Sequence, residues 1–288
     1  MMGAASAPVP ASYSDCFVDV GGHRLHYQDF GTNHENEGRP VMVCLHGGAA
    51  NAHWFDFVAA GFTAGYHVLA PDQRGHGDSD WTNPPAYSYQ DYAADLDRFA
   101  AKLDLRDFVL VGHSMGGMVA MVYAATYPGR MGKLVVVDTS ISLSDERISA
   151  MREVGNRGGS SYATREEIVG RYRLRPGNSL AGPEVVRHIA EHSVRQFPDG
   201  GWRYKFDRNV YAVREKIDGL PFWERIKVPA LLVKAQRSER ISQAVYTEVK
   251  ARCPRVELAE VPDSDHHVTL DNPAGFTRVV KAFLARSA

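Results

Sequence analysis

Hydrophobic positions in this chain fall into short runs that alternate with segments of helical spacing. Short, apolar runs are typical of strands buried on both faces of a parallel sheet, and they occur at residues 41–45, 66–70, 109–111, 134–137 and 228–233, with a last strand expected at 256–261. Apolar positions three and four apart predict helices at residues 52–60, 89–103, 115–127, 242–252 and 273–285. This alternation predicts an α/β fold whose sheet is mostly parallel, with helices on both faces and right-handed crossovers.

Two segments depart from this rhythm. Near the start, alternating residues 16–20 and 23–30 flank Gly21-Gly22 and predict an antiparallel hairpin. From 140 to 224 the strand pattern disappears, and glycine and proline pairs separate short helical patterns. We therefore divide the chain into a loose tail (1–15), a core in two parts (16–139 and 225–288) and a helical cap inserted between them (140–224). The cap is expected over the carboxyl edge of the sheet, where open α/β folds bind ligands.

Composition and charge exclude several classes of partner. The 288 residues, 44% hydrophobic and 23% charged, suffice for one large α/β domain with an inserted subdomain. A formal net charge of −1 indicates no nucleic-acid surface and no polybasic membrane anchor. No apolar run approaches the roughly 18 residues of a membrane span. Residues 1–14 lack the basic and apolar regions of a signal peptide, so we expect a cytoplasmic protein.

The cysteines indicate neither a disulfide framework nor a metal site. Cys16, Cys44 and Cys253 lie far apart, without a C-x-x-C pair or a histidine at metal-ligand spacing. They are expected to be structural thiols in a reducing compartment. No metal or other cofactor is predicted, the expected partner is a small-molecule substrate, and the pattern predicts no particular oligomeric state.

Candidate chemistry begins where the apolar run at 109–111 ends in Gly112-His113-Ser114-Met115-Gly116. A G-x-S-x-G pattern between a strand and a helix predicts a nucleophile elbow, in which the serine sits on a strained turn and the glycines allow close approach. A serine hydroxyl also needs a base within hydrogen-bond reach and a third group that orients the base. Asp265-His266-His267 follows the last strand, so the order of serine first and histidine last favours this loop as the source of the base.

These motifs resemble the α/β-hydrolase superfamily, in the branch with a helical cap between the sixth and seventh core strands. The resemblance spans residues 17–284 and rests on four motifs in order: His46-Gly47-Gly48, Asp72-Gln73-Arg74-Gly75-His76-Gly77-Asp78-Ser79, Gly112-His113-Ser114-Met115-Gly116-Gly117, and His266 followed by Asp271-Asn272-Pro273. It implies an eight-stranded, mostly parallel sheet and a serine hydrolase that needs no cofactor. Four ordered motifs are specific for the fold and say little about the substrate.

The resemblance also suggests a catalytic triad. The family places its histidine seven residues before the proline that opens the last helix, which selects His266 over His267. The family acid commonly follows the strand after the cap, where this chain has Ser238, which cannot carry the required negative charge. The alternatives are Asp138, at the end of the strand before the cap, and Glu239. We prefer Asp138 because it needs no register shift.

The remaining site residues follow from the same resemblance. The oxyanion hole is expected to use the backbone amides of Gly48 and Met115. Asp72 and Arg74 are expected to brace loops around the site. The substrate pocket is expected to include His46, His53, Trp54, His113, Trp202 and His267.

The charge of the cap gives no strong indication of the substrate. Residues 140–218 hold 14 Lys and Arg against 11 Asp and Glu, an excess too small to imply an anionic substrate. Aromatic residues in the same segment suggest an apolar roof over the pocket instead.

The sequence therefore predicts hydrolysis of a small or medium carboxylic ester or lactone through an acyl-enzyme. The same residues would serve an amide hydrolase or an enzyme that cleaves a carbon–carbon bond next to a ketone. A ligand receptor with slow turnover is the alternative from another class. Epoxide hydrolysis and dehalogenation are disfavoured, since the relatives that catalyse them have an aspartate at the place of Ser114.

Overall fold

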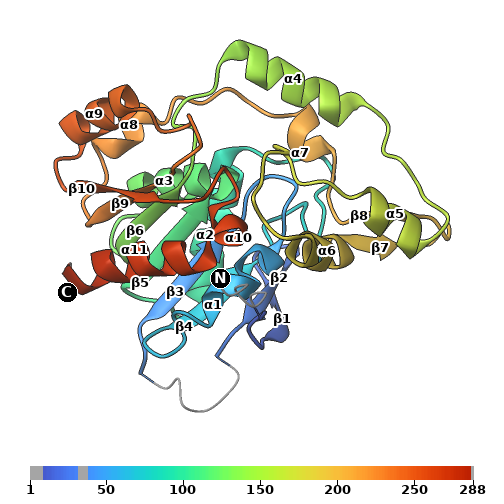
Figure 1. Ribbon diagram of the computed structural model, residues 1–288, viewed down its shortest axis with the longest axis horizontal. Helices are drawn as coiled ribbons and strands as arrows, with labels where there is room; N and C mark the ends of the chain where they lie inside the picture. Colours follow the sequence, from blue (N-terminus) through green and yellow to red (C-terminus); the bar gives the residue numbers. More distant parts are fainter. Residues whose placement is uncertain (1–8, 32–37, 287–288) are drawn as a thin grey trace, which may run out of the picture.

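The computed structural model describes residues 9–31 and 38–286, and one eight-stranded sheet forms its centre (Figure 1). The strand order is β1-β2-β4-β3-β5-β6-β9-β10. These strands are β1 (Ser14–Asp19), β2 (Arg24–Asp29), β3 (Val41–Leu45), β4 (His67–Pro71), β5 (Phe108–His113), β6 (Met131–Val137), β9 (Ala230–Ala235) and β10 (Val256–Val261). Strand β2 pairs antiparallel with β1 and β4, and all other neighbours are parallel. The predicted α/β fold with a mostly parallel sheet is confirmed.

Helices cover both faces of the sheet, because each central strand is apolar on both sides. In β3, Val43 and Leu45 pack into one core cluster, while Met42 and Cys44 pack into the other. The first cluster includes residues of α2 (Tyr89–Lys102), α3 (Met115–Thr126), α8 (Leu220–Trp223) and α9 (Gln243–Arg252). The second includes residues of α1 (Asp56–Ala59), α10 (Val268–Asp271) and α11 (Pro273–Arg286).

The segment between β6 and β9 forms a substructure of its own. Figure 1 shows its elements before α8 gathered to one side of the sheet, away from α9 and α11. They are α4 (Asp145–Asn156), α5 (Arg165–Arg171), α6 (Pro183–His192), β7 (Val194–Gln196), β8 (Trp202–Tyr204) and α7 (Asn209–Ala212).

Two features of this segment correct the expectation of a helical cap over 140–224. Strands β7 and β8 form an antiparallel pair, because Gly200 adopts a φ of 84° in the turn between them. Helix α8, at the end of the segment, packs against α3 and α9 and so belongs to the core. We use "the insert" for residues 140–219, which precede α8.

Some element boundaries differ from those expected. The sheet begins at Ser14 rather than Cys16, because Ser14 pairs with Asp29; residues 1–8 of the predicted tail lie outside the described residues. Strand β9 begins at Ala230, after Pro229, whose nitrogen has no hydrogen to donate to a strand partner. The helix expected at 52–60 consists of a 3-10 turn, η2 (Ala52–Phe55), followed by α1.

Two further sequence expectations can be compared with the structure. All three cysteines are free thiols, with Cys44 and Cys253 buried, as predicted. Within residues 9–31 and 38–286, no helix has the length and apolar character needed to cross a membrane.

Candidate active site

Ser114 occupies a strained turn between β5 and α3. Its φ of 54° and ψ of −115° are unusual for a residue with a side chain. A Cβ atom on Gly112 would lie 2.3 Å from the carbonyl oxygen of Gly116, and a Cβ on Gly116 would lie 2.4 Å from that of Leu45. Since both distances are far below van der Waals contact, only glycine allows strand, turn and helix to approach this closely. The elbow geometry expected from the G-x-S-x-G pattern is present.

Three side chains from distant parts of the chain form a continuous hydrogen-bonded row. Nε2 of His266 lies 3.0 Å from Oγ of Ser114, and Nδ1 of His266 lies 2.8 Å from Oδ2 of Asp138. Ser114 follows β5, Asp138 follows β6 and His266 follows β10, so the three side chains meet at the carboxyl edge of the sheet. Glu239, the alternative acid, is exposed, and Nδ1 of His266 already donates to Asp138.

Hydrogen-bond donors that were not predicted from the sequence surround the Asp138 carboxylate. Its carboxylate accepts hydrogen bonds from the Ser238 hydroxyl (2.8 Å) and the Ala235 amide (3.3 Å), and Nε of Arg240 lies 3.6 Å away. Burial raises the pKa of Asp138, while these donors oppose that rise. Ser238 occupies the position, three residues after Ala235, where the family acid was expected. That position was the sequence signal that Ser238 would lie close to the candidate acid.

The backbone of His266 is fixed on both sides. Its amide donates to the Asp265 carboxylate at 2.7 Å, and its carbonyl accepts from Nε2 of His113 at 2.7 Å. Asp265 therefore stabilises the turn through its side chain. Burial holds the pKa of His113 well below 6.5, so this ring is neutral and can donate from one nitrogen. His113 is a positioning residue for the histidine loop.

The electrostatic environment keeps His266 neutral. Burial is the largest cause that lowers its pKa well below 6.5, followed by the positive charge of Arg240. A neutral imidazole can accept a proton from the Ser114 hydroxyl.

We expect the acid limb of the pH–activity profile to lie below pH 6.5, because activity is lost when falling pH protonates His266. Arg240→Gln removes a charge that disfavours the imidazolium, so the limb should move toward higher pH. The measurement is kcat/KM across pH for the wild type and the variant. Arg237→Gln is the control, since Arg237 is exposed and faces Asp263. An unchanged limb in Arg240→Gln would contradict the electrostatic role of Arg240.

The loop after β3 brings Gly48 toward the same place. His46 shapes this loop, because its Nδ1 donates to the Gly47 carbonyl at 2.7 Å and its Nε2 accepts from the Gln73 amide at 3.0 Å. A Cβ on Gly48 would lie 2.9 Å from the Tyr211 hydroxyl, so a side chain there would require the Tyr211 ring to shift. The amide of Met115 opens helix α3 and has no acceptor within that helix. Both amides are thus available for the expected oxyanion hole.

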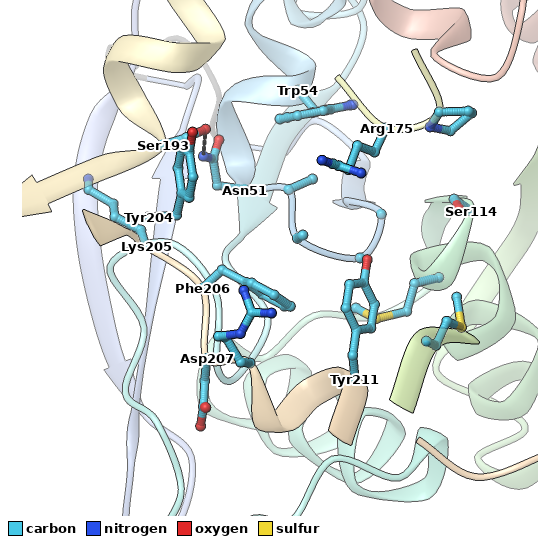
Figure 2. Close-up of a pocket in the computed structure, with 18 of the residues that line it drawn as sticks. Asn51, Trp54, Ser114, Arg175, Ser193, Tyr204, Lys205, Phe206, Asp207 and Tyr211 are labelled. Atoms are coloured by element: carbon cyan, nitrogen blue, oxygen red, sulfur yellow. Dashed lines mark hydrogen bonds between the residues drawn. The ribbon is translucent and has the colours of Figure 1, made fainter. Parts of the chain in front are cut away.

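A cavity of about 930 Å³ opens onto Ser114 and His266, whereas the buried Asp138 does not line it (Figure 2). Its wall includes Ser114, His266, Gly48 and Met115, and the far side is made by residues of the insert. Trp54, His113 and His267 line it, as expected. Nε2 of His267 also donates to the Pro176 carbonyl at 3.0 Å, which ties the insert to the histidine loop.

The placement of three other expected pocket residues is corrected, because none of them lines this cavity. His46 is fully buried under the loop that it shapes. His53 pairs with Asp56 at 2.8 Å. Trp202 lies in β8, where its backbone pairs with Tyr162. The hydrophobic and polar pattern could not show which way these side chains point.

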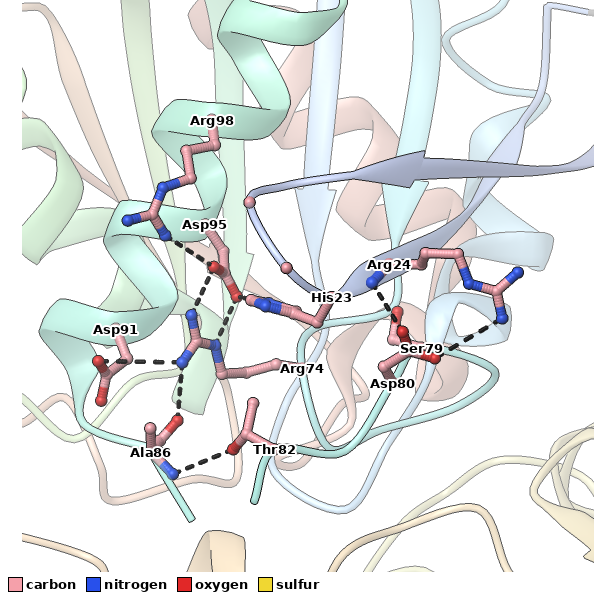
Figure 3. A network of polar contacts seen from close by, with 12 residues as sticks. His23, Arg24, Arg74, Ser79, Asp80, Thr82, Ala86, Asp91, Asp95 and Arg98 are labelled. Atoms are coloured by element: carbon pink, nitrogen blue, oxygen red, sulfur yellow. Dashed lines mark hydrogen bonds and ion pairs between the residues drawn. The ribbon is translucent and has the colours of Figure 1, made fainter. Parts of the chain in front are cut away.

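A buried polar network supports the loop after β4 (Figure 3). The guanidinium of Arg74 binds both oxygens of the Asp95 carboxylate and donates to the Ala86 carbonyl at 2.9 Å. Asp72 accepts from the Ala52 amide at 2.7 Å and from the His26 ring at 2.7 Å. The prediction that Asp72 and Arg74 brace loops is confirmed.

Two groups of side chains have the spacing of metal ligands, and both lie outside the cavity wall. They are His53, His188 and His192, and His26, Asp72 and Asp78; in each group the ligand atoms lie within 4.8 Å of one another. Each group already bonds within the protein, since Asp56 accepts from both His53 and His188, and Asp72 accepts from His26.

Comparison with known proteins identifies the family. The family model for the alpha/beta hydrolase fold matches residues 40–273. The chain belongs to this family. An sn-1-specific diacylglycerol lipase ABHD11 of Danio rerio is 30% identical to this hydrolase over 261 residues, covering 84% of the chain and 78% of that protein. The 2-(acetamidomethylene)succinate hydrolase of Mesorhizobium japonicum is 26% identical over 274 residues, covering 93% of the chain and 94% of that protein.

Comparison with solved structures supports the assignment of the chain to this family. The crystal structure of E-2-(acetamidomethylene)succinate hydrolase superposes on the hydrolase with a TM-score of 0.81 at 25% identity, covering 95% of this chain and 100% of that one. The chain is thus similar over nearly its whole length to enzymes that are themselves named as hydrolases.

Proposed function

We propose that this hydrolase cleaves a small or medium carboxylic ester or lactone through an acyl-enzyme formed on Ser114. The observation that carries the proposal is the row from Ser114 through His266 to Asp138, which opens into the cavity. The lipase name of the Danio rerio relative supports an ester as substrate.

The chemistry follows from this row. Nε2 of His266 takes the hydroxyl proton as Oγ of Ser114 attacks the acyl carbon, and Asp138 stabilises the imidazolium that forms. The amides of Gly48 and Met115 donate to the oxyanion of the tetrahedral intermediate. His266 then protonates the leaving group, and in the second half it activates the water that releases the acid.

Cleavage of an amide is the second candidate function. The Mesorhizobium japonicum relative is named for a substrate that contains an acetamido group. The same row of residues can cleave an ester or an amide. An ester and an amide with the same acyl group, compared by kcat/KM, would decide between these functions.

We expect steady-state turnover of p-nitrophenyl butyrate with one acyl group per chain as an intermediate. Intact-protein mass spectrometry during turnover should show a mass increase of one butyryl group on Ser114, which disappears when substrate is exhausted. A slow-turnover receptor would instead stop after one acyl transfer per chain. Turnover without any acylated protein would contradict the acyl-enzyme.

A further inference from the structure

The wall of the cavity is far more cationic than the chain as a whole. Eight arginines and one lysine line it, whereas Asp207 is its one carboxylate side chain. Asp207 is already used, because it accepts hydrogen bonds from the Tyr87 hydroxyl and the Asn209 amide. The insert contributes eight of these cations, so its mild excess of basic residues includes many that face the cavity.

Four of these nine cations have a carboxylate partner, and the other five form no ion pair within the part of the chain that the structure describes. Lys205 pairs with Asp78, Arg203 with Asp199, and Arg171 with Glu167. Arg240 faces Asp138. These side chains are largely neutralised, so they shape the wall without requiring a charged ligand.

Arg214 differs because it is buried and lacks a carboxylate. It is 2% exposed, and within the described part of the chain no carboxylate oxygen lies within 4.0 Å of it. Its Nε and Nη1 atoms have no hydrogen-bond partner there, and Nη2 contacts the sulfur of Met115 at 3.1 Å. Stacking of its Cζ atom 4.9 Å from the centre of the Tyr89 ring compensates only part of the cost of burying the charge.

A guanidinium stays charged at every physiological pH, so such a site is incomplete without an anion. Arg214 lines the cavity and touches Met115, the residue that follows Ser114. An anion bound beside this guanidinium would therefore lie close to the expected oxyanion hole.

Another arginine without an ion pair enters the same cavity from the loop between α5 and α6. Figure 2 shows Arg175 between Trp54 and Tyr211, inside the cavity. Within residues 9–31 and 38–286 it forms no ion pair within 4.0 Å. Its neighbour Pro176 is held by His267, so the loop that carries Arg175 is anchored beside the candidate base.

We propose that Arg214, assisted by Arg175, binds a carboxylate of the substrate, and that the hydrolase acts on half-esters or half-amides of dicarboxylic acids. The planar guanidinium fork matches a carboxylate in a two-point contact. This inference rests on the proposed function, since it places the anion next to the bond that Ser114 attacks.

The first test compares monoethyl glutarate with diethyl glutarate, two substrates that differ in one negative charge. Wild-type kcat/KM should favour the half-ester by at least about tenfold, and Arg214→Gln should bring that preference down to about twofold or less. Arg175→Gln should reduce it less, because Arg175 is exposed. Arg187→Gln is the matched control: it lies on α6, pairs with Glu191 and does not line the cavity. Equal loss on both substrates in Arg214→Gln would overturn the proposal.

Stability separates anion binding from a structural role. Removing an unpaired buried charge is expected to leave Arg214→Met as stable as the wild type or more stable, whereas a structural arginine would destabilise on removal. The comparison is the urea midpoint of the two proteins. A clear loss of stability together with unchanged selectivity would also overturn the proposal.

A binding experiment keeps this inference distinct from the proposed function. Glutarate, titrated calorimetrically into Ser114→Ala, should bind, and the Ser114→Ala/Arg214→Gln protein should bind it at least tenfold more weakly. Inorganic phosphate in a parallel titration should bind more weakly than glutarate. Binding of glutarate without hydrolysis of any ester would refute the proposed function alone. Ester hydrolysis without charge preference, or tighter binding of phosphate, would refute this inference alone.

Discussion

Ser114→Ala should lower kcat for p-nitrophenyl butyrate by about 10⁴-fold or more, because no other nucleophile replaces the hydroxyl in the row with His266. The fold should remain, since alanine keeps the Cβ atom and hence the same backbone strain at a φ of 54°. Only one hydrogen bond is lost, at a cost of about 1 kcal/mol. Steady-state kinetics and a thermal melt of the same preparation measure both effects.

The control for this prediction is another serine to alanine change. Ser242 accepts a hydrogen bond from the Val245 amide at the start of α9 and does not line the cavity. Ser242→Ala should cost about 1 kcal/mol of stability through loss of the cap and keep its turnover. If Ser114→Ala retained more than about 1% of wild-type turnover, acyl transfer through Ser114 would be refuted.

Asp138→Asn should lower kcat by about 10³ to 10⁴-fold. An asparagine leaves the packing nearly unchanged, yet it cannot stabilise the imidazolium and presents an amide to Nδ1 of His266. Glu239→Gln is the paired variant and should change kcat by less than about twofold, because Glu239 is exposed. Steady-state kinetics of the two variants decide which carboxylate serves His266.

A second-site change sharpens this result. The Ser238 hydroxyl lies 2.8 Å from the Asp138 carboxylate, which lies 2.8 Å from His266, so a carboxylate at position 238 can reach the same ring. Ser238→Asp in the Asp138→Asn background should restore about ten- to a hundredfold of the lost kcat. A large loss in Glu239→Gln, with Asp138→Asn near wild type, would instead name Glu239 as the acid.

Much of the candidate site follows from local sequence. Gly112 and Gly116 mark the elbow in a short sequence pattern, although a Cβ atom on Gly116 would meet the distant Leu45. Chain order points to the loop 265–267 as the source of the base, and the family resemblance selects His266 by its distance from Pro273. The carboxyl ends of parallel strands meet at one edge, so these residues were expected to lie together.

Other features depend on contacts between segments that are distant in sequence. Asp138 meets His266 across 128 positions and Ser238 across 100, and no local pattern encodes either pair. Trp202 was expected in the pocket because it is aromatic, yet its strand turns it away. Side-chain direction in irregular segments is set by packing rather than by hydrophobic period.

The sequence by itself determined the family fold, the elbow and the base, because buried strands, strained turns and chain order are short-range properties. Only the tertiary structure decided which carboxylate faces His266 and which arginines face the cavity. Charge composition counts Arg214 like any surface arginine, since the count carries no information about burial or partners. Folding places that guanidinium in a wall without a carboxylate beside it, and this placement carries the inference about the substrate.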